Sequence, residues 1–423
     1  MYSDDTQEKL LCLRSEPADF RLLAFYWGLF SILPLASVLL QGMRLFSSSK
    51  DLQLRVSSLI FSVSIYLGFI NSTKLHESDL ASYADLFESA GRVDILSYVL
   101  SLGRDPLYFL ISYLGHYCFW GDFDLYIIFL TTLIYWFLLT SIRVVMQNEN
   151  LSAQFTVFVL LLFAFLPDHF LWTAHIIRQM LALSISIYFI TNFLFNNKFS
   201  IISAVCAVLV HSSVGVFILF AVLSRALATF VSGKRLVLIL LPVLLTVYLN
   251  RTAIFAALIG NVLKTSSGER FGGDIADDTM IVAAEWLLPN LVLITIFIFA
   301  LLFIISRHQS VKVKQFSVLY LLFFLFMLFA KESGSYTALI AYRYLIDIYV
   351  FIPLLLPLVL KEPFFLNICR LRPSDMYMSL VYLSITVIFI FRFFNTINNS
   401  NWQFMSTLGL VTNPILYSVF IVQ

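Results

Sequence analysis

The sequence has few charged residues and few cysteines, and these shortages exclude several classes of function. Only 12% of the 423 residues are charged, and 27 Lys and Arg nearly balance 25 Asp and Glu, for a net charge of +2. A near-neutral sum argues against a nucleic-acid partner, which calls for basic clusters. The four cysteines form no C-x-x-C pair and have no histidine at metal-ligand spacing. Neither a disulfide nor a zinc site is therefore expected.

Motifs for nucleotide binding and for secretion are also missing. Neither G-x-x-x-x-G-K-[ST] nor G-x-G-x-x-G occurs, so no nucleotide cradle is expected. The first twenty residues are polar and mixed in charge, without the basic and apolar regions of a cleavable signal. We therefore expect the first hydrophobic segment to be a permanent membrane anchor.

What the chain has in abundance is apolar surface. Apolar residues make up 60% of the sequence, and the mean hydropathy is +0.90. One soluble core could not bury that much apolar surface, so the composition predicts a protein that lies in lipid. A helix needs about 20 mostly apolar residues to cross a bilayer. Candidate segments lie near 23–41, 56–71, 106–119, 124–142, 155–172, 176–195, 199–224, 236–250, 286–306, 315–331, 344–360 and 376–394.

Two of these segments allow more than one interpretation. Segment 106–119 is short, so it is either a span or a re-entrant piece that protein must cover. Segment 199–224 is long and carries His211-Ser212-Ser213 at its centre, so it is either one tilted helix or two half-helices. We expect an all-α polytopic transmembrane helix bundle of about 11–13 membrane segments, forming a single integral membrane domain over residues 1–423.

Lysine and arginine in short loops predict which ends of the segments face the cytoplasm. Four basic loops are separated by even numbers of spans: Arg44/Lys50/Arg55, Arg225/Lys234/Arg235, Arg307/Lys312/Lys314 and Lys361/Arg370/Arg372. The opposite, extracytoplasmic side then receives two long acidic loops, 72–105 and 251–285. Long loops often carry function, although carboxylates such as Asp79 and Asp85 could also be merely solvated.

Charged side chains inside a membrane are costly, so those that occur there are candidates for function. Arg178 opens an otherwise apolar helical segment, and His175 and Gln179 are predicted to lie beside it on the same helix. A ligand-binding role for Arg178 competes with a buried ion pair to Asp168 and with a side chain that snorkels to the interface.

Two further residues of this kind have their own alternatives. His211 lies between apolar stretches and could make an interhelical hydrogen bond, to Ser212 or to a neighbouring helix, in place of a catalytic role. Arg343 follows Tyr342 and could simply pair with Asp347, four residues further along a helix.

Four short motifs follow one another along the chain. They are Asp79-x-x-x-Tyr83, Asp105-Pro106-x-Tyr108-Phe109, Ile177-Arg178-Gln179-x-x-Ala182 and His211-Ser212-Ser213. In this order they resemble the EpsG/Wzy family of polysaccharide polymerases, whose patterns are roughly D-x-x-x-Y, E-P-x-F, I-R-Q-x-x-A and H-x-S-A. Arg343 extends the resemblance. Asp105 stands where the family has Glu, and Val214 stands where it has Ala.

The resemblance implies a GT-C-like membrane glycosyltransferase in the bacterial cytoplasmic (inner) membrane, with its active site facing the periplasm. Such an enzyme joins polyprenyl-diphosphate-linked oligosaccharide repeat units into O antigen or a related surface polysaccharide. The expected partners are this lipid-linked substrate, membrane lipid, a chain-length regulator and a flippase. No cofactor, metal or nucleic acid is expected.

The implied reaction needs a base for the acceptor hydroxyl and cations for the departing diphosphate. We expect Arg178 and Arg343 to bind the diphosphate, because a guanidinium stays charged and matches phosphate oxygens. His211 is the expected general base. A second group is expected to contact the substrate: Asp79, Tyr83, Gln179, His175 and Tyr342.

Other functions stay open at this point. A lipid-linked oligosaccharide flippase, an O-antigen ligase-like glycosyltransferase and a structural assembly subunit could each carry such residues. A further condition concerns topology, because strict alternation through twelve spans places Arg178 nearer the cytoplasm. An outer active site therefore requires 106–119 to be re-entrant and 199–224 to form two half-helices.

Overall fold

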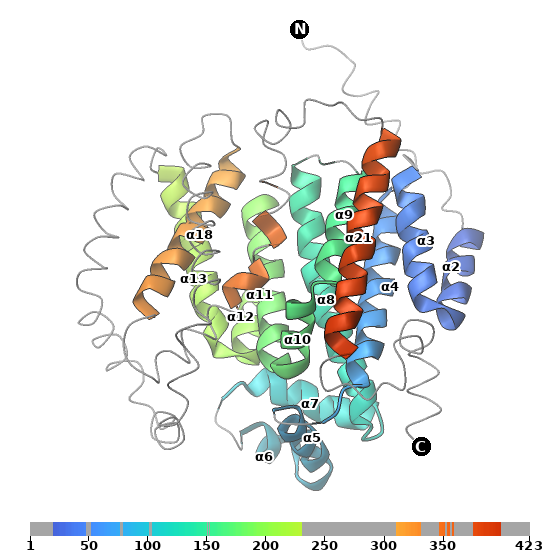
Figure 1. Cartoon of the computed structure of the whole chain (residues 1–423). Coiled ribbons are helices and arrows are strands. Elements are labelled where there is room, and N and C mark those ends of the chain that lie inside the picture. Colours follow the sequence, from blue (N-terminus) through green and yellow to red (C-terminus); the bar gives the residue numbers. More distant parts are fainter. Residues whose placement is uncertain are drawn as a thin grey trace, which may run out of the picture. The chain divides into compact units, whose positions relative to one another are not determined.

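A computed structural model shows an all-α chain, as predicted (Figure 1). The described residues are 20–47, 52–76, 79–100, 104–149, 151, 153–230, 310–330, 347–351, 353–355, 358 and 375–398. The chain divides into two compact units, one made of Met1–Leu181 with Cys369–Gln423 and the other of Ala182–Ile368. Each unit is described by itself, and the prediction of a single domain over 1–423 stays a prediction.

Three helices within the described residues are long and apolar enough to cross a membrane. They are Phe123–Asn148, Ile177–Phe195 and Ser212–Thr229, and a bent pair of helices, Phe155–Ala164 with Pro167–His175, makes a fourth if it counts as one span. The predicted segments 236–250 and 286–306 lie outside the described residues. The protein is an all-α membrane helix bundle, as the apolar segments predicted.

The first predicted span, 23–41, is wrong, because two helices take its place. Helix α2 covers Phe20–Ile32 and α3 covers Pro34–Ser47. The Ser37 hydroxyl donates to the Tyr26 carbonyl oxygen at 2.8 Å, whereas eleven residues of one continuous helix span about 16 Å. Pro34 has no N–H and disfavours a helical residue before it, so the chain folds back at this point.

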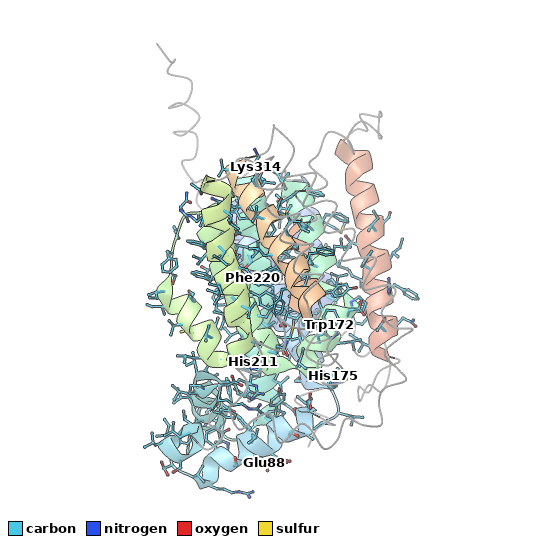
Figure 2. All side chains as sticks on the ribbon, turned by 90° about the vertical axis from the view of Figure 1, so that its left-hand side faces the viewer. Glu88, Trp172, His175, His211, Phe220 and Lys314 are labelled. Carbon is cyan, nitrogen blue, oxygen red and sulfur yellow. The ribbon has the colours of Figure 1, made fainter. Side chains whose placement is uncertain are left out.

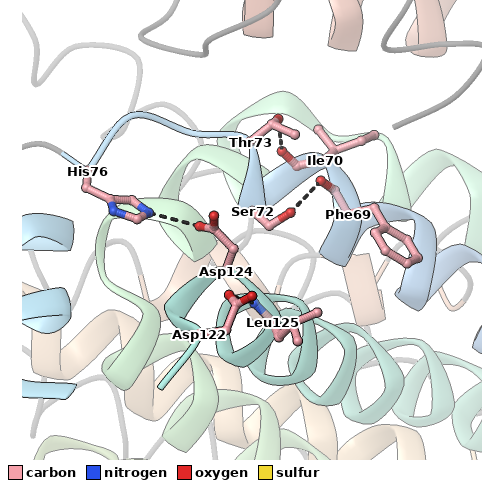
Figure 3. A network of polar contacts seen from close by, with 8 residues as sticks. All are labelled: Phe69, Ile70, Ser72, Thr73, His76, Asp122, Asp124 and Leu125. Carbon is pink, nitrogen blue, oxygen red and sulfur yellow. Dashed lines mark hydrogen bonds and ion pairs between the residues drawn. The ribbon is translucent and has the colours of Figure 1, made fainter. Parts of the chain in front are cut away.

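Helices α4 (Leu52–Ser72) and α8 (Phe123–Asn148) pack side by side and antiparallel in the first unit. Three side-chain contacts join them from one end to the other: Ser57–Arg143 at 2.5 Å, Asn71–Thr131 at 2.8 Å and His76–Asp124 at 3.1 Å. The last of these, between His76 just after α4 and the first turn of α8, is drawn in Figure 3. Residues 72 and 123 therefore lie at the same end of the pair.

Between these two helices the chain forms a layer at that end, which we call the cap (Figure 1). The cap consists of α5 (Asp79–Ser89), the short 3-10 turn η1 (Ala90–Arg92), α6 (Ile95–Leu100) and α7 (Pro106–Cys118). The chain enters and leaves the cap at one end of the α4–α8 pair, so segment 106–119 does not cross to the other end. Helix α7 has 13 residues and is about 20 Å long, shorter than a bilayer core.

The cap packs against α8 through aromatic rings and through the close approach of α7 to α8. The Phe87 ring stacks on Tyr126 with centroids 4.7 Å apart, and a Cβ on Gly115 would lie 2.6 Å from the same tyrosine ring. Within the cap, the Tyr98 hydroxyl donates to the Leu86 carbonyl oxygen at 2.8 Å. Burial raises the pKa of Tyr98 above its ordinary value, so the phenol stays a hydrogen-bond donor at neutral pH.

Two helix breaks shape the next stretch of the first unit. Helix α9 (Ala153–Ala164) and α10 (Pro167–His175) are bent by 47°, because Pro167 cannot continue a helix and instead starts a new one. Helix α11 covers Ile177–Phe195 and is separated from α10 by Ile176, whose φ and ψ are −119° and 49°. His175 and Arg178 therefore do not share one continuous helix, contrary to the prediction from their spacing.

The C-terminal helix α21 (Asp375–Asn398) also belongs to the first unit, where it packs against α9 and α10. Its Phe393 ring meets the rings of Phe165 at 5.3 Å and Phe170 at 5.0 Å, in edge-to-face geometry. All three side chains are fully buried. This contact holds the bent α9–α10 pair from the side.

In the second unit, segment 199–224 forms two helices, as one of its two interpretations predicted. Helix α12 ends at Val210, His211 is extended with φ −159° and ψ 119°, and after the short turn η2 (Ser212–Val214) helix α13 begins at Gly215. Helix α12 covers Ile201–Val210, α13 covers Gly215–Phe230 and α18 covers Val311–Ala330.

Helix α13 is fixed by two contacts within the second unit. Phe217 and Phe220 pack on α18, with ring centroids 5.1 Å from Phe323 and 5.8 Å from Phe326 respectively (Figure 2). Near its other end, an Arg225 Nη1 donates to the Phe193 carbonyl oxygen of α11 at 2.9 Å. His211 lies at the end of α13 away from this contact (Figure 2).

Candidate functional site

The candidate site in the first unit is built around a buried ion pair. Arg178, in the first turn of α11, places Nη1 3.3 Å from Oδ2 of Asp105, just before α7. The exposed fractions of the two side chains are 14% and 1%. The partner is thus Asp105, and not Asp168, which is exposed in the first turn of α10.

Two tyrosine rings line the guanidinium of Arg178. Its Cζ lies 5.9 Å from the ring centroid of Tyr83 in α5 and 5.8 Å from that of Tyr108 in α7. The rings also meet each other edge-to-face at 5.9 Å. Burial raises the pKa of Tyr108 well above its ordinary value, so this phenol stays neutral beside the cation. Ring faces attract a cation and hold the guanidinium plane in place.

The backbone at Asp105 explains how the carboxylate reaches Arg178. Asp105 has φ 53° and ψ 47°, in the left-handed region, and Pro106 follows it as the first residue of α7. Aspartate adopts this conformation more readily than most residues, and proline suits the first helical position. The turn directs the chain into α7, while Tyr108 comes to lie beside Arg178.

Arg178 keeps part of its hydrogen-bonding capacity unused. Its Nε is buried and has no hydrogen-bond partner among the described residues. A guanidinium carries five N–H donors in a planar fork, and the contact with Asp105 involves Nη1.

A second basic group lies at the same end of the unit. Lys74, just after α4, is only 4% exposed, and its Nζ lies 2.9 Å from Nδ1 of His175. Asp79, at the start of α5, interacts electrostatically with the same imidazole. Figure 2 shows His175 at the end of α10 that faces the cap, with Glu88 on the outer side of the cap.

The structure brings together some predicted site residues and leaves others untested. Arg178 and Tyr83 are in contact, and Asp79 lies close to His175, which is itself exposed. Gln179 is buried in the first turn of α11. His211 belongs to the second unit, where it is half-buried at the break between α12 and α13. The last predicted site residues and one loop lie outside the described residues: Arg343, Tyr342 and 251–285.

Two residues of the cluster were missed as site residues. Asp105 was recognised only as part of a motif, and Lys74 was not singled out at all. A signal for Lys74 exists in the sequence, since a lysine directly after an apolar helix stands on the side that the positive-inside rule predicts to be poor in basic residues. Its burial is decided by α10, which is remote in sequence.

Within the described residues, no group of three or more His, Cys, Asp or Glu side chains is arranged to hold a metal ion. Metal independence stays a prediction. The described site consists instead of two cations, two carboxylates and two aromatic rings.

The sequence was compared with models of known protein families. The family model of the EpsG family matches residues 57–407, which include all four motifs. The chain belongs to the EpsG family. No curated protein and no solved structure matches the chain. The EpsG family consists of Wzy-type polymerase-like proteins, so this chain is a membrane protein of polysaccharide biosynthesis.

Proposed function

We propose that this EpsG-family protein polymerises polyprenyl-diphosphate-linked oligosaccharide repeat units into O antigen or a related surface polysaccharide. The observation that carries the proposal is the convergence of three motifs on one guanidinium. Tyr83 of the first motif and Asp105 with Tyr108 of the second surround Arg178 of the third. Residues about 95 positions apart thus meet around a cation suited to phosphate.

The proposed site faces the periplasm from the cytoplasmic membrane. Arg44 in the last turn of α3, Arg55 at the beginning of α4 and Arg143, which contacts Ser57, gather at one end of the α4–α8 pair, whereas Lys74 follows α4 at the other end. Helix α4 has 21 residues, about 30 Å, which matches the thickness of a bilayer core. Basic residues favour the cytoplasmic side, so the Arg55 end is inside and the cap, with Asp105, is outside. The chain enters and leaves the cap at the same end of the α4–α8 pair, so segment 106–119 is not a span. This path of the chain supports the proposed orientation.

In the proposed reaction, an acceptor hydroxyl on a new lipid-linked repeat unit attacks C1 of the first sugar of the growing chain. The bond from C1 to the phosphate oxygen breaks, and the lipid diphosphate leaves with the bond's electron pair. His211 takes the proton of the acceptor hydroxyl as a general base. Its place between two half-helices leaves the imidazole half-buried.

The other predicted residues have binding roles in this proposal. Arg178 and Arg343 bind the departing diphosphate and stabilise its growing charge. Asp79 is exposed at the start of α5, one turn before Tyr83, so both can orient sugar hydroxyls along one helix face. Gln179 and Tyr342 add hydrogen-bonding groups to the substrate.

The test is a surface-glycan gel from a bacterial strain that lacks the gene and carries variants on a plasmid. We expect wild type to restore a ladder of long chains and His211→Ala to give single-repeat product. Arg178→Gln is paired with the double variant Asp105→Asn/Arg178→Gln, which leaves no unpaired buried charge. Arg92→Gln is the matched control, because Arg92 is an exposed cation of the cap.

Membrane levels of each variant are measured beside the gel. A double variant that accumulates normally and still makes no ladder supports a role for the Asp105–Arg178 pair in the reaction. Full-length ladders in the strain without the gene end the proposal. Lipid-linked repeats held inside the cell indicate a flippase, and long unattached chains indicate a ligase, so the same strain separates these alternatives.

A further inference from the structure

Helix α7 is apolar on nearly every side, although it is too short to cross a membrane. The sequence of its 13 residues is PLYFLISYLGHYC, with no Asp, Glu, Lys or Arg. One face packs on protein through its buried residues, which are Tyr108, Phe109, Ser112 and Gly115. Leu114 and Tyr117 are 51% and 55% exposed. A helix that is apolar all round is usually buried in protein or surrounded by lipid, and this face of α7 is exposed.

Helix α7 lies across the ends of two longer helices (Figure 1). Just before its first residue, Asp105 pairs with Arg178 in the first turn of α11. Near its other end, Gly115 packs on Tyr126 in the first turn of α8. Both α8 and α11 are long and apolar enough to cross a membrane, and α7 meets each of them where it begins. Helix α7 is therefore placed close to the plane of the membrane surface.

The chain leaves α7 through a turn that exposes a tryptophan. Trp120 has φ 53°, in the left-handed region, and is 88% exposed. Bulky residues rarely adopt this conformation, and such strain is found where function requires it. Gly121 follows with φ 79°, which glycine adopts without a steric cost. An outward-facing indole is typical of the headgroup region of a membrane, where the ring meets lipid and the N–H meets water.

The exposed face of α7 continues onto α8. The ring of Phe119, just after α7, lies 5.5 Å from the ring of Phe129. Leu125, Phe129 and Trp136 are exposed apolar residues of α8, and their spacing of four and seven residues puts them on one helix face. Because α8 is long and apolar enough to cross a membrane, lipid is the expected surroundings of this face.

We propose that α7 is an interfacial helix, which lies in the plane of the membrane with Leu114, Tyr117 and Trp120 in the headgroup–acyl boundary. The lipid bilayer covers this surface, since the surface continues onto the lipid-facing side of α8. Helix α5 faces water, because its exposed residues are polar: Asp79, Ser82, Asp85 and Glu88. The proposal holds for either orientation of the cap and does not depend on the proposed function, because it concerns depth alone.

The depth of α7 also sets the depth of the candidate site. Asp105 immediately precedes α7, so its ion pair with Arg178 lies at the level of the lipid headgroups. In the proposed function, the diphosphate of a lipid-linked substrate lies at the same level.

The test measures the depth of nitroxide spin labels on single cysteines of the full-length protein, in nanodiscs of phosphatidylethanolamine and phosphatidylglycerol. Native Cys118 is exposed on α7, and one variant keeps it while the other three cysteines are replaced by serine or alanine. Leu114→Cys, Phe129→Cys and Glu88→Cys are made in protein without native cysteines. Oxygen collides mainly with labels in lipid, and a water-soluble nickel chelate collides mainly with labels in water.

We expect oxygen to reach the labels at 114 and 118 several-fold more than at Glu88→Cys, with an immersion of about 5–10 Å into the headgroup–acyl boundary. Phe129→Cys is the lipid control and should lie deeper, and Glu88→Cys is the water control. Labels at 114 and 118 that behave like Glu88→Cys would show that the cap stands clear of the membrane. Labels shielded from both reagents would show that protein covers this face, as a second copy of the chain would.

Either of these two results overturns the proposal. The Cys118 variant changes no residue of α7, so it decides the question if Leu114→Cys fails to fold. The depth is measured without turnover, so its outcome is separate from that of the surface-glycan gel.

Discussion

At the scale of single residues, the chain buries a charged pair, Arg178 with Asp105, among protein side chains. Arg178 is neutralised by Asp105 on one edge and faced by two tyrosine rings, yet its Nε has no partner among the described residues. In the proposed function this arrangement has both a structural role and a ligand-binding role. The ion pair would then fix the guanidinium before substrate arrives, which lowers the entropy lost on binding.

Replacing Asp105 with asparagine tests the structural half of this arrangement. Asparagine keeps the size and tolerates φ 53°, so the change removes little except the charge. Removing one partner of a buried ion pair typically costs about 3–5 kcal/mol, and we expect Asp105→Asn to approach the lower end. The double variant Asp105→Asn/Arg178→Gln should recover part of the loss.

Unfolding of the detergent-solubilised protein measures these effects as a double-mutant cycle. The expected order of melting temperatures is wild type, then the double variant, then Asp105→Asn. Equal melting temperatures for wild type and Asp105→Asn would show that the guanidinium does not depend on this carboxylate.

At the scale of helices, the fold depends on how closely neighbouring helices pack and on where helices are interrupted. Helices α4 and α8 approach so closely at Gly68 that an added Cβ would lie 2.7 Å from the Ile128 carbonyl oxygen. Small residues allow such contacts between membrane helices. The α4–α8 pair in turn supports the cap, so its spacing affects where Asp105 and Tyr108 lie.

The variant Gly68→Ala tests this packing. A backbone atom cannot yield as a flexible side chain does, so α4 and α8 must move apart, and we expect a loss of about 1–3 kcal/mol in stability. The matched control is Gly28→Ala in α2, where a Cβ meets nothing within 4 Å. Alanine has the higher helix propensity, so the control should be neutral or slightly stabilising. A loss of stability that is equal in both variants contradicts the packing explanation.

At the scale of the whole molecule, the direction of the chain through the membrane decides which chemistry the site can do. The proposed function, polymerisation of lipid-linked repeat units on the outer face, requires the cap to lie outside and the Arg44 end of α3 to lie inside. The basic residues near the Arg44 end of α3 support this orientation. The cap supports it too, because the chain enters and leaves the cap at one end of the α4–α8 pair.

Cysteine labelling tests the orientation directly. The four native cysteines are first replaced by serine or alanine, because Cys118 is exposed. Single cysteines are then placed at Glu88 in the cap and at Arg44 in the last turn of α3, both exposed. A membrane-impermeant maleimide added to spheroplasts should label Glu88→Cys at once and Arg44→Cys only after the membrane is opened. The reverse pattern would place the cap in the cytoplasm and remove the proposed substrate.

The sequence by itself determined that the protein lies in lipid, that its fold is all-α and which family it resembles. Apolar segments predict membrane helices because length and hydropathy are local properties. Motif order was enough to identify Arg178, Tyr83 and His211 as candidates, and a re-entrant path for the short segment 106–119 was already one of its two stated alternatives. The two half-helices around His211 were among the stated alternatives for the same reason, since a polar triplet interrupts an apolar stretch.

Only the tertiary structure decided which residues meet. Asp105 rather than Asp168 pairs with Arg178, and Lys74 reaches His175 across 101 positions of sequence, because antiparallel packing of α4 and α8 brings distant chain segments to one end. Pro34 and Ile176 interrupt helices that periodicity alone would continue. Long-range pairing depends on where helices end and pack, and a pattern of single residues carries no such information.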